Sequence, residues 1–544
     1  MRTVVEAMAA AASDAGTLTT FRGGDELVVR WAQVHDRARR MATFMSKMDI
    51  ALGSRVALIG DTSVDMMVAI QAVWLSGAAV SVLPPAPRRS DPASRNAIFA
   101  DARFDIVLAD GEADLYPVRA LSLPKVVEES RALPAKRLIP PDPADLAILQ
   151  YTSGSTSDPR GVPVTHGHLA ANLDAIKGAF GYGGEAVRML SWLPLYHDMG
   201  LIGFACLPMA CGWTLLLQTP ASFALRPMSW LEAASRHRIT TTGAPNFAFR
   251  LVTSLLEANT ELDLSPLRFL LCGAEPISAE GLARFAAAGR RCGLDPAAIV
   301  PAYGLAEATL AASISPPGTG VVVDRVQPDA LQREGYARPA AGAAARCLVM
   351  LGPPVPGTEI RVADPESGAP APSRQIGRIE VRGSSVVGHY WGEPPPPPGS
   401  WFNTGDLGYL ADGELVVCGR QKDVLFCAGR NVYPQDVEVA AARVPAVRAG
   451  GAVAFGVPSD PEDPSHPEDP GDRLIVAVEF RGTDARGVRR AVAAAVSEET
   501  GMRPADVVAL TPGRIPKTSS GKLRRAEARR RYLCGELASK GKVQ

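Results

Sequence analysis

Cysteine and lysine are scarce in this sequence of 544 residues, and neither sign of charge is in excess. The eight cysteines include no CxxC pair, which excludes a disulfide scaffold and favours reduced thiols in a cytoplasmic protein. Acidic and basic residues number 57 each, so a globally basic nucleic-acid binder is not expected. Apolar residues at 47% exclude a disordered chain, and the length predicts about two to four domains.

Long apolar runs are also missing. One uncharged stretch, residues 200–217, resembles a membrane span, but Gly203, Pro208 and Gly212 interrupt it. It is also short for a span of about 20 residues, so we expect a buried helix followed by a buried strand. The first sixteen residues include Glu6 and Asp14 and show no signal-peptide pattern. Neither a membrane span nor a leader is therefore predicted.

Helix and strand patterns alternate through the first third of the chain. They predict helices at 31–48 and 63–76 and strands at 55–59, 78–83 and 105–109, an order typical of a parallel sheet covered by helices. Short β segments begin near residue 355, and a smaller α+β unit begins at 424. We predict an α/β fold with an N-terminal domain at 1–419, which includes a β-rich subdomain at about 355–419. A hinge at 420–423 and a small mobile C-terminal domain at 424–544 follow.

The sharpest local motif is the loop Tyr-Thr-Ser-Gly-Ser-Thr-Ser-Asp-Pro-Arg-Gly at 151–161. Its hydroxyls, and the backbone N–H groups that Gly154 leaves accessible, suit the oxygens of a polyphosphate. The Walker A pattern GxxxxGK[ST] is absent. Taken alone, the segment could equally be an ordinary Ser/Thr loop.

Four further segments accompany the loop. Asp406 lies in Asn-Thr-Gly-Asp-Leu-Gly, and Arg420 follows 14 residues later. Tyr303 and Glu307 are the ends of Tyr-Gly-Leu-Ala-Glu, and Lys522 ends the loop Ile-Pro-Lys-Thr-Ser-Ser-Gly-Lys. A single acid could accept hydrogen bonds from ribose hydroxyls. Each segment could be purely structural, but the ordered set is hard to obtain by chance.

That ordered set resembles the adenylate-forming superfamily of acyl-CoA synthetases, peptide-synthetase adenylation domains and luciferases. The resemblance covers nearly the whole chain. The motif residues are most similar to those of fatty acyl-AMP ligases at 149–156, 192–200, 243–246 and 429–436. Two departures stand out. Arg160 replaces the lysine usual in the phosphate loop, and the segment 390–401 is short and proline-rich. The second departure weakens any inference of an insertion that excludes coenzyme A.

The resemblance implies a reaction in two halves. A carboxylic acid, expected to be a fatty acid, attacks the α-phosphate of ATP to give acyl-AMP and pyrophosphate, with Mg²⁺ assisting. A thiol then takes the acyl group. Lys522 is expected to be catalytic, and His197 to close the acyl pocket, although a lone histidine in an apolar stretch is more often a core residue. Lys422 is the expected hinge, and segments 199–213 and 243–251 the expected acyl site.

The remaining implied roles are nucleotide and metal contacts. The residues expected to bind ATP or AMP are Thr152, Ser153, Gly154, Ser155, Thr156, Arg160, Gly273, Ala274, Glu275, Pro276, Tyr303, Gly304, Asp406 and Arg420. Glu307, with Thr156, is the expected Mg²⁺ ligand, because Mg²⁺ is commonly held by one or two carboxylates together with phosphate oxygens.

Three alternatives stay open at this point. The acceptor thiol, taken here as that of an acyl carrier protein, could instead belong to coenzyme A. The chain could be an inactive nucleotide-binding assembly protein. The basic segment 522–542 could contact nucleic acid, but a solvated terminal helix accounts for it equally well, and the balanced total charge favours that interpretation.

Overall fold

The protein is described by a computed structural model that covers residues 3–12, 15–22, 24–85, 92–111, 116–152, 159–182, 186–258, 261–342, 344–427, 429–458, 471–518 and 521–537. The chain divides into two compact units. The first comprises Met1–Val322, Met350–Ile360 and Glu380–Thr404, and the second comprises Val323–Val349, Arg361–Ile379 and Gly405–Gln544. The sequence-based boundary at residue 419 and the hinge at 420–423 stay predictions.

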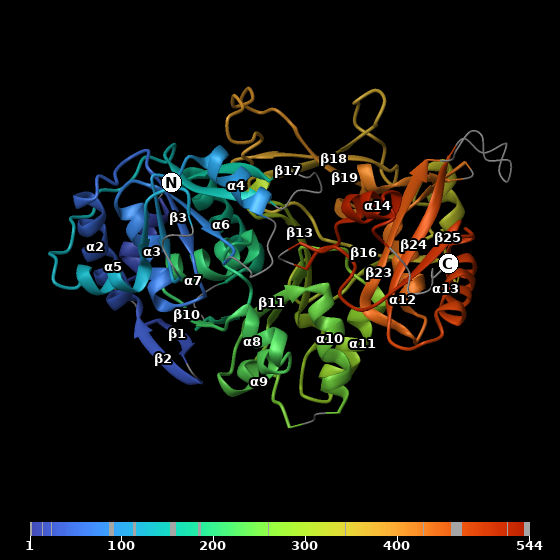
Figure 1. Ribbon diagram of the computed structural model, residues 1–544, viewed down its shortest axis with the longest axis horizontal. Coiled ribbons are helices and arrows are strands. Elements are labelled where there is room, and N and C mark those ends of the chain that lie inside the picture. The colour runs from blue at the N-terminus through green and yellow to red at the C-terminus, as the bar shows by residue number, and fades with distance from the viewer. Residues whose placement is uncertain are drawn as a thin grey trace. The chain divides into compact units, whose positions relative to one another are not determined.

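A six-stranded sheet forms one part of the first unit, with the order β6-β5-β3-β4-β7-β8 (Figure 1). All neighbouring strands are parallel except β7 and β8, which form an antiparallel pair. Its strands are β3 (Arg55–Ile59), β4 (Ala79–Leu83), β5 (Ile106–Ala109), β6 (Ala120–Ser122), β7 (Leu146–Thr152) and β8 (Arg160–Thr165). The helices of this part are α1 (Val4–Ala11), α2 (Trp31–Lys47), α3 (Val64–Leu75), α4 (Pro92–Ala102), α5 (Leu123–Ser130) and α6 (His166–Phe180).

Helix α3 forms the centre of this core. Every residue of α3 except Asp65 is buried, and Ser63 caps its first turn by accepting from the Met66 N–H. A helix that is apolar all round must be covered on all sides. It contacts β3 and β4 on one side and α2 and α5 on the other. Helix α2 is amphipathic, as its helical spacing predicts, and places Val34, Ala38 and Met41 in the core.

An eight-stranded sheet forms the other part of the first unit. Its order is β14-β13-β12-β11-β9-β10-β1-β2. The strands from β13 to β1 are parallel to one another, and the edge strands β14 and β2 pair antiparallel with β13 and β1. The strands are β1 (Thr17–Arg22), β2 (Asp25–Arg30), β9 (Arg188–Ser191), β10 (Thr214–Leu217), β11 (Thr241–Pro245), β12 (Phe269–Gly273), β13 (Ile299–Gly304) and β14 (Ala311–Ile314). Its helices include α8 (Pro220–Leu225), α9 (Ser229–Arg236), α10 (Asn246–Glu257) and α11 (Ala279–Arg290), and α10 lies beside α11 (Figure 1).

The uncharged stretch after residue 199 is buried, as predicted. It forms a π-helix at Met199–Cys206, then α7 (Leu207–Cys211), then β10. Every residue of the π-helix is buried. No helix among the described residues is both long enough and apolar enough to cross a membrane. None of the eight cysteines, all of which lie in described residues, forms a disulfide, and Cys347 and Cys534 are exposed, so only part of the set consists of core thiols.

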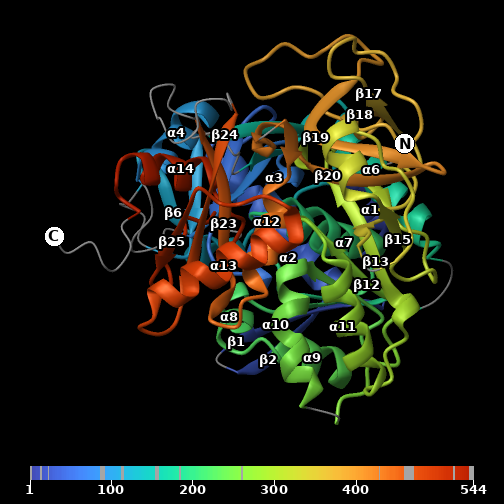
Figure 2. The same ribbon diagram turned by 90° about the vertical axis from the view of Figure 1, so that its right-hand side faces the viewer.

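The remaining sheets are small. β15 (Val323–Val326) pairs with β16 (Arg346–Val349), and a four-stranded sheet has the order β17 (Thr358–Ala363), β18 (Gly377–Gly383), β19 (Phe402–Ala411), β20 (Glu414–Arg420). The last part contains β21 (Leu425–Cys427), β22 (Arg430–Val432), α12 (Pro434–Ala442), β23 (Val447–Pro458), β24 (Asp472–Phe480), α13 (Ala485–Thr500), β25 (Asp506–Leu510) and α14 (Arg525–Leu533). Figure 2 shows α12 beside β23, while α13 contacts α12 and β25, and the three strands β23-β24-β25 form one sheet.

Candidate active site

Several predicted site residues follow the carboxyl ends of parallel strands in the eight-stranded sheet. His197 follows β9, Gly273 ends β12, and Gly304 ends β13. The register places Pro245 beside Gly273 and Cys272 beside Pro301, so these ends lie along one edge. The crevice outside the carboxyl ends of parallel strands is where open α/β sheets bind their ligands. The structure therefore brings the predicted adenine segments 273–276 and 303–304 together.

The backbone at this edge contains two unusual conformations. Ala274 has φ +68° directly after β12, and Thr309 has φ +69° and ψ −60° with its side chain fully buried. A positive φ at a β-branched residue is a genuine outlier, and such strain clusters at functional sites. Gly304 admits no side chain, because a Cβ there would lie 2.0 Å from the Leu310 carbonyl oxygen. The close backbone approach at Gly304, before Glu307, and the strained backbone at Thr309, after it, thus fix the turn that carries Glu307.

Glu307 lies in a short 3-10 helix, Ala306–Ala308, and contacts a residue that the motifs did not identify. The Tyr390 hydroxyl donates to its carboxylate at 2.6 Å. Burial raises the pKa of Tyr390, and the Glu307 carboxylate raises it further, so the phenol stays a donor at neutral pH. The Val387 N–H also donates to the Glu307 carbonyl oxygen at 2.8 Å. The segment 387–390 thereby holds both the backbone and the carboxylate of Glu307.

Asn172 holds the same turn from the other side. This fully buried amide on α6 donates to the carbonyl oxygens of Ala311, at 2.9 Å, and Ala308, at 3.3 Å. It also donates to the Ser385 hydroxyl and accepts from the Ala311 N–H. The sequence contains one indication of this role, because Asn172 is a polar residue on a helix face otherwise made of Leu169, Leu173 and Ile176. No motif includes Asn172, so it was not predicted.

Arg160 lies at the base of the predicted phosphate loop and contacts Tyr390, the residue that donates to Glu307. It begins β8, where it pairs in register with Thr152 of β7. Its guanidinium carbon lies 3.3 Å from the centre of the Tyr390 ring, and its Nη2 lies 2.6 Å from Glu393 Oε1. The predicted loop residues Ser153, Gly154, Ser155 and Thr156 lie outside the described residues.

The remaining predicted residues of the first unit have local partners. His197 Nδ1 lies 2.7 Å from Asp198 Oδ1 at the start of the π-helix. Gly200 has no room for a side chain, because a Cβ would lie 2.2 Å from the Pro194 carbonyl oxygen. The Glu275 carboxylate accepts from the Phe247 N–H at 2.5 Å, so Glu275 fastens the 273–276 turn to the start of α10.

The predicted acyl segments 199–213 and 243–251 touch one another. A Cβ on Gly243 would lie 2.9 Å from Phe204 Cζ. The π-helix that supplies Phe204 is a rare element often found at functional sites. This contact places the two segments side by side, while their role in acyl binding stays a prediction.

The predicted ribose pair and the predicted lysines lie in the second unit. Asp406 and Arg420 are opposite one another on β19 and β20, with Arg420 Nε 3.1 Å from Asp406 Oδ1. Lys422 lies in the 3-10 turn Gln421–Asp423. Lys522 is half-buried, and two hydrogen bonds with Thr518 close its loop. The Lys522 N–H donates to the Thr518 hydroxyl, and the Thr518 N–H donates to the Lys522 carbonyl oxygen. Lys517 instead donates to the Gly450 carbonyl oxygen.

An ion cluster with little solvent exposure joins the predicted hinge segment to the helix that follows the Lys522 loop. Arg525, the first residue of α14, lies 2.8 Å from Asp423 and 2.7 Å from Glu438 on α12. Burial raises the pKa of Glu438, and the Arg525 charge opposes that rise. Arg525 is three residues after Lys522, so the loop is anchored next to residue 422. Sequence reasoning did not find this cluster.

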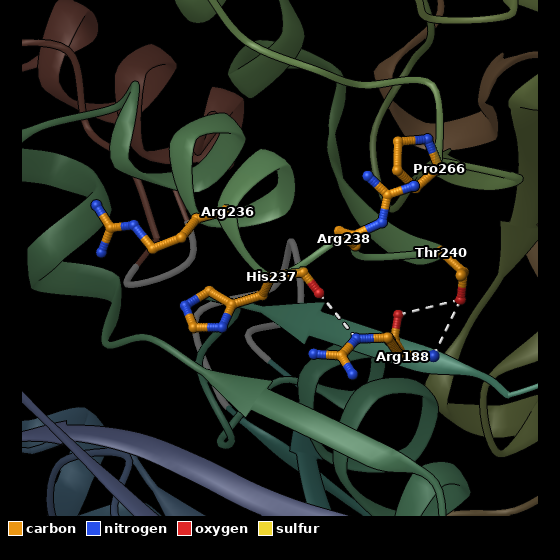
Figure 3. A pocket seen from close by; sticks show the side chains of 6 residues that line it. All are labelled: Arg188, Arg236, His237, Arg238, Thr240 and Pro266. Atoms are coloured by element: carbon orange, nitrogen blue, oxygen red, sulfur yellow. Dashed lines mark hydrogen bonds between the residues drawn. The ribbon is translucent and has the colours of Figure 1, made fainter.

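An open cavity of about 480 Å³ lies in the first unit, away from the predicted site residues that the structure describes (Figure 3). Its lining residues are Arg188, Arg236, His237, Arg238, Thr240 and Pro266. The Arg188 Nε–H donates to the His237 carbonyl oxygen, and Thr240 bonds the Arg188 backbone (Figure 3). Arg188 begins β9 and Thr240 precedes β11, so this cavity lies at the amino ends of the strands. No predicted site residue that the structure describes lines it.

Comparisons with known proteins identify the family to which this chain belongs. The sequence profile described as "AMP-binding enzyme" matches residues 9–391. A ligase of Mycobacterium tuberculosis, Rv1013, is 37% identical over 95% of this chain and 97% of its own length. The long-chain-fatty-acid–AMP ligase FadD26 of Mycobacterium marinum is 33% identical over 92% of this chain and 91% of its own.

Two solved structures extend the comparison. One, from work on fatty acyl-adenylate ligases from E. coli and L. pneumophila, has a TM-score of 0.88 and 34% identity over 99% of both chains. The other, a fatty acyl-adenylate ligase from L. pneumophila in complex with acyl adenylate and pyrophosphate, has a TM-score of 0.73 and 28% identity. It covers 98% of this chain and 96% of its own. The α/β fold class, with a large N-terminal and a smaller C-terminal domain, is thereby confirmed.

Proposed function

We propose a two-step reaction for this chain, which belongs to the AMP-binding enzyme family: activation of a fatty acid by ATP to acyl-AMP, then transfer of the acyl group to the pantetheine thiol of an acyl carrier protein. The chain is an enzyme of the ligase class. The resemblance to fatty-acid–AMP ligases supports the first step, and the choice of acceptor is the finer part of the proposal.

One observation carries the proposal. Glu307, at the carboxyl edge of the parallel strands, is joined through Tyr390 to Arg160 at the base of the Gly/Ser/Thr loop. The Glu307 carboxylate suits a phosphate-bound cation, and the Arg160 guanidinium suits phosphate oxygens. Both groups contact the same tyrosine, Tyr390. This arrangement fits a nucleotide polyphosphate between the two sheets of the first unit.

In the proposed first step, a carboxylate oxygen of the fatty acid forms a bond to the α-phosphorus of ATP. The bond from that phosphorus to the bridging oxygen breaks, and pyrophosphate leaves with the electron pair. Charge stabilisation dominates such phosphoryl-type displacements. Lys522 supplies a flexible positive charge to the carboxylate and the α-phosphate. Asp406 and Arg420 contact the ribose, and the turns at 273–276 and 303–304 enclose the adenine.

The residues present fit Mg²⁺. No group of three or more His, Cys, Asp or Glu that could hold a metal occurs in the part of the chain that the structure describes. Mg²⁺ bound to nucleotide phosphates nevertheless commonly takes only one or two protein carboxylates. Glu307, together with Thr156, would hold the ion. The ion would neutralise charge on the phosphate oxygens.

In the proposed second step, the pantetheine thiolate attacks the acyl carbon, and AMP leaves with the electron pair of the broken C–O bond of the mixed anhydride. Lys522 and a pantetheine arm need the same approach to the acyl carbon, so they must alternate. We place the rotation of the C-terminal domain at Lys422, in the short turn after β20, because hinge motions are absorbed by a few residues at the ends of elements.

The decisive experiment incubates the protein with ATP, Mg²⁺ and a panel of fatty and aryl acids, and identifies products by mass spectrometry. Each incubation is repeated with phosphopantetheinylated carrier protein and with coenzyme A. Acyl-AMP and acylated carrier are expected. Acyl-CoA in place of acylated carrier would overturn the proposed acceptor, and failure to form acyl-AMP with any acid would overturn the activity.

A further inference from the structure

Glu393 neutralises the guanidinium that the phosphates are expected to use. Arg160 Nη2 lies 2.6 Å from Glu393 Oε1, and the pair is half-exposed, at 45% for the arginine side chain and 50% for the glutamate. The residues are 233 positions apart in sequence, so the contact is made by the fold and not by local geometry.

The position of Glu393 is defined by its backbone. Its N–H donates to the Tyr390 carbonyl oxygen at 3.0 Å, and its second oxygen, Oε2, accepts from the Tyr390 N–H at 3.1 Å. Five prolines follow directly, and a Cβ on Gly388 would lie 3.2 Å from Pro396 Cγ. Because proline fixes φ, the chain after Glu393 is stiff. The turn therefore presents one carboxylate oxygen to Arg160 in a fixed place.

The geometry points to an exchange: Glu393 occupies Arg160 as an internal carboxylate, and the polyphosphate of ATP displaces it. Carboxylate and phosphate oxygens accept from a guanidinium in the same forked geometry. The Arg160 guanidinium lies over the Tyr390 ring, and this contact holds the arginine in place while its anionic partner changes. The inference rests on the proposed function, since it names a residue that tunes ATP binding in that reaction.

The expected effect is modest. Ion pairs as exposed as this one contribute little, and loss of such a competitor should improve binding by about two- to fivefold. Glu393→Gln keeps an acceptor for the Tyr390 N–H and leaves the bond from Tyr390 to Glu307 in place. It should lower the KM for ATP about two- to fivefold, with the KM for the acid unchanged.

A matched control exists in the same unit. Arg382 pairs with Glu359 at 2.7 Å, and its guanidinium also lies over an aromatic ring, that of Trp401. Glu359→Gln therefore removes the same kind of pair away from the candidate site, and it should leave the KM for ATP unchanged. Glu393→Gln in an Arg160→Ala background should also have no effect on ATP, because its target is gone.

The test measures ATP dependence of pyrophosphate release, together with calorimetric binding of a non-hydrolysable ATP analogue, for the parent and these variants. Tighter ATP binding in Glu393→Gln alone supports the exchange. If the parent forms acyl-AMP while Glu393→Gln shows unchanged or weaker ATP binding, this inference fails and the proposed function stands. A gain that persists in the Arg160→Ala background would also overturn it. A parent that neither binds the analogue nor forms acyl-AMP overturns both.

Discussion

Arg525 neutralises two buried carboxylates at once, and its removal tests whether the ion cluster positions the Lys522 loop. Its side chain is 17% exposed, and those of Asp423 and Glu438 are 14% and 11% exposed. The Arg525→Met variant keeps the apolar stem and leaves two acids unpaired in a poorly solvated place. Removing one partner of a buried pair costs about 3–5 kcal/mol. We expect about 3 kcal/mol, because all three side chains retain some solvent contact.

The pH dependence has a definite sign. Burial holds the folded-state pKa of Glu438 above its ordinary value, and loss of Arg525 removes the charge that opposes this rise. A group whose pKa is raised on folding favours the folded state while protonated and loses that contribution as the pH rises through the folded-state pKa. The penalty in Arg525→Met should therefore be smaller near about pH 5 than near about pH 8.

Local stability is the quantity to measure, because a chain of several domains does not unfold in one step. Amide hydrogen exchange followed by mass spectrometry should show α14 and α12 exchanging about 100-fold faster in Arg525→Met, the equivalent of about 3 kcal/mol. Adding Glu438→Gln should restore part of the protection. Arg531→Met is the control on the same helix, since Arg531 is 38% exposed and its partner Glu527 also pairs with Arg530.

Unchanged exchange in α14 would refute the reasoning, as would a penalty that grows toward acid pH. The functional consequence is separate: acyl-AMP formation should fall in Arg525→Met and recover in part with Glu438→Gln. Recovery of exchange protection without any recovery of activity would show that the cluster stabilises the fold but does not position Lys522.

Three further predictions concern the candidate site itself. Lys522→Ala should slow acyl-AMP formation by roughly 10²–10³-fold, because one charge aimed at the reacting phosphate is lost, while Lys517→Ala should change the single-turnover rate little. Tyr390→Phe should raise the Mg²⁺ concentration needed for half-maximal pyrophosphate release about tenfold, because a charged hydrogen bond to Glu307 of about 1.5–3 kcal/mol is lost; an unchanged Mg²⁺ titration would contradict this. Arg160→Lys should raise the KM for ATP, since lysine lacks the planar fork, and a KM equal to that of the parent would show that stacking on Tyr390 is unimportant.

The elements with clear apolar periodicity could be predicted from the sequence. The expected strand at 55–59 matches β3, and the expected helix at 31–48 matches α2 within one residue. The expected burial of the stretch 200–217 was also right. Continuous apolar runs and helical spacing are local signals, so they need no knowledge of the partner elements.

The sequence did not predict how polar side chains would be paired. The bond from Tyr390 to Glu307 joins residues 83 apart, and Asn172 contacts residues 136 to 213 positions away. Such pairs depend on which loops the sheets bring together, and no local periodicity encodes that. The motifs identified the groups expected to touch the nucleotide, whereas the residues that hold those groups in place lacked any motif.

The two departures from the family pattern turn out to be parts of one feature. Arg160 stands where the family resemblance implies a lysine, and the segment after Tyr390 is rich in proline. In the structure, the guanidinium of Arg160 stacks on Tyr390 and pairs with Glu393, at the start of that same segment. An ammonium group has no plane to stack and is bound more strongly by water, so lysine would gain less from this turn. This segment suits an arginine: it supplies an aromatic face and a carboxylate that one guanidinium contacts together, and the Tyr390 hydroxyl connects the same feature to Glu307.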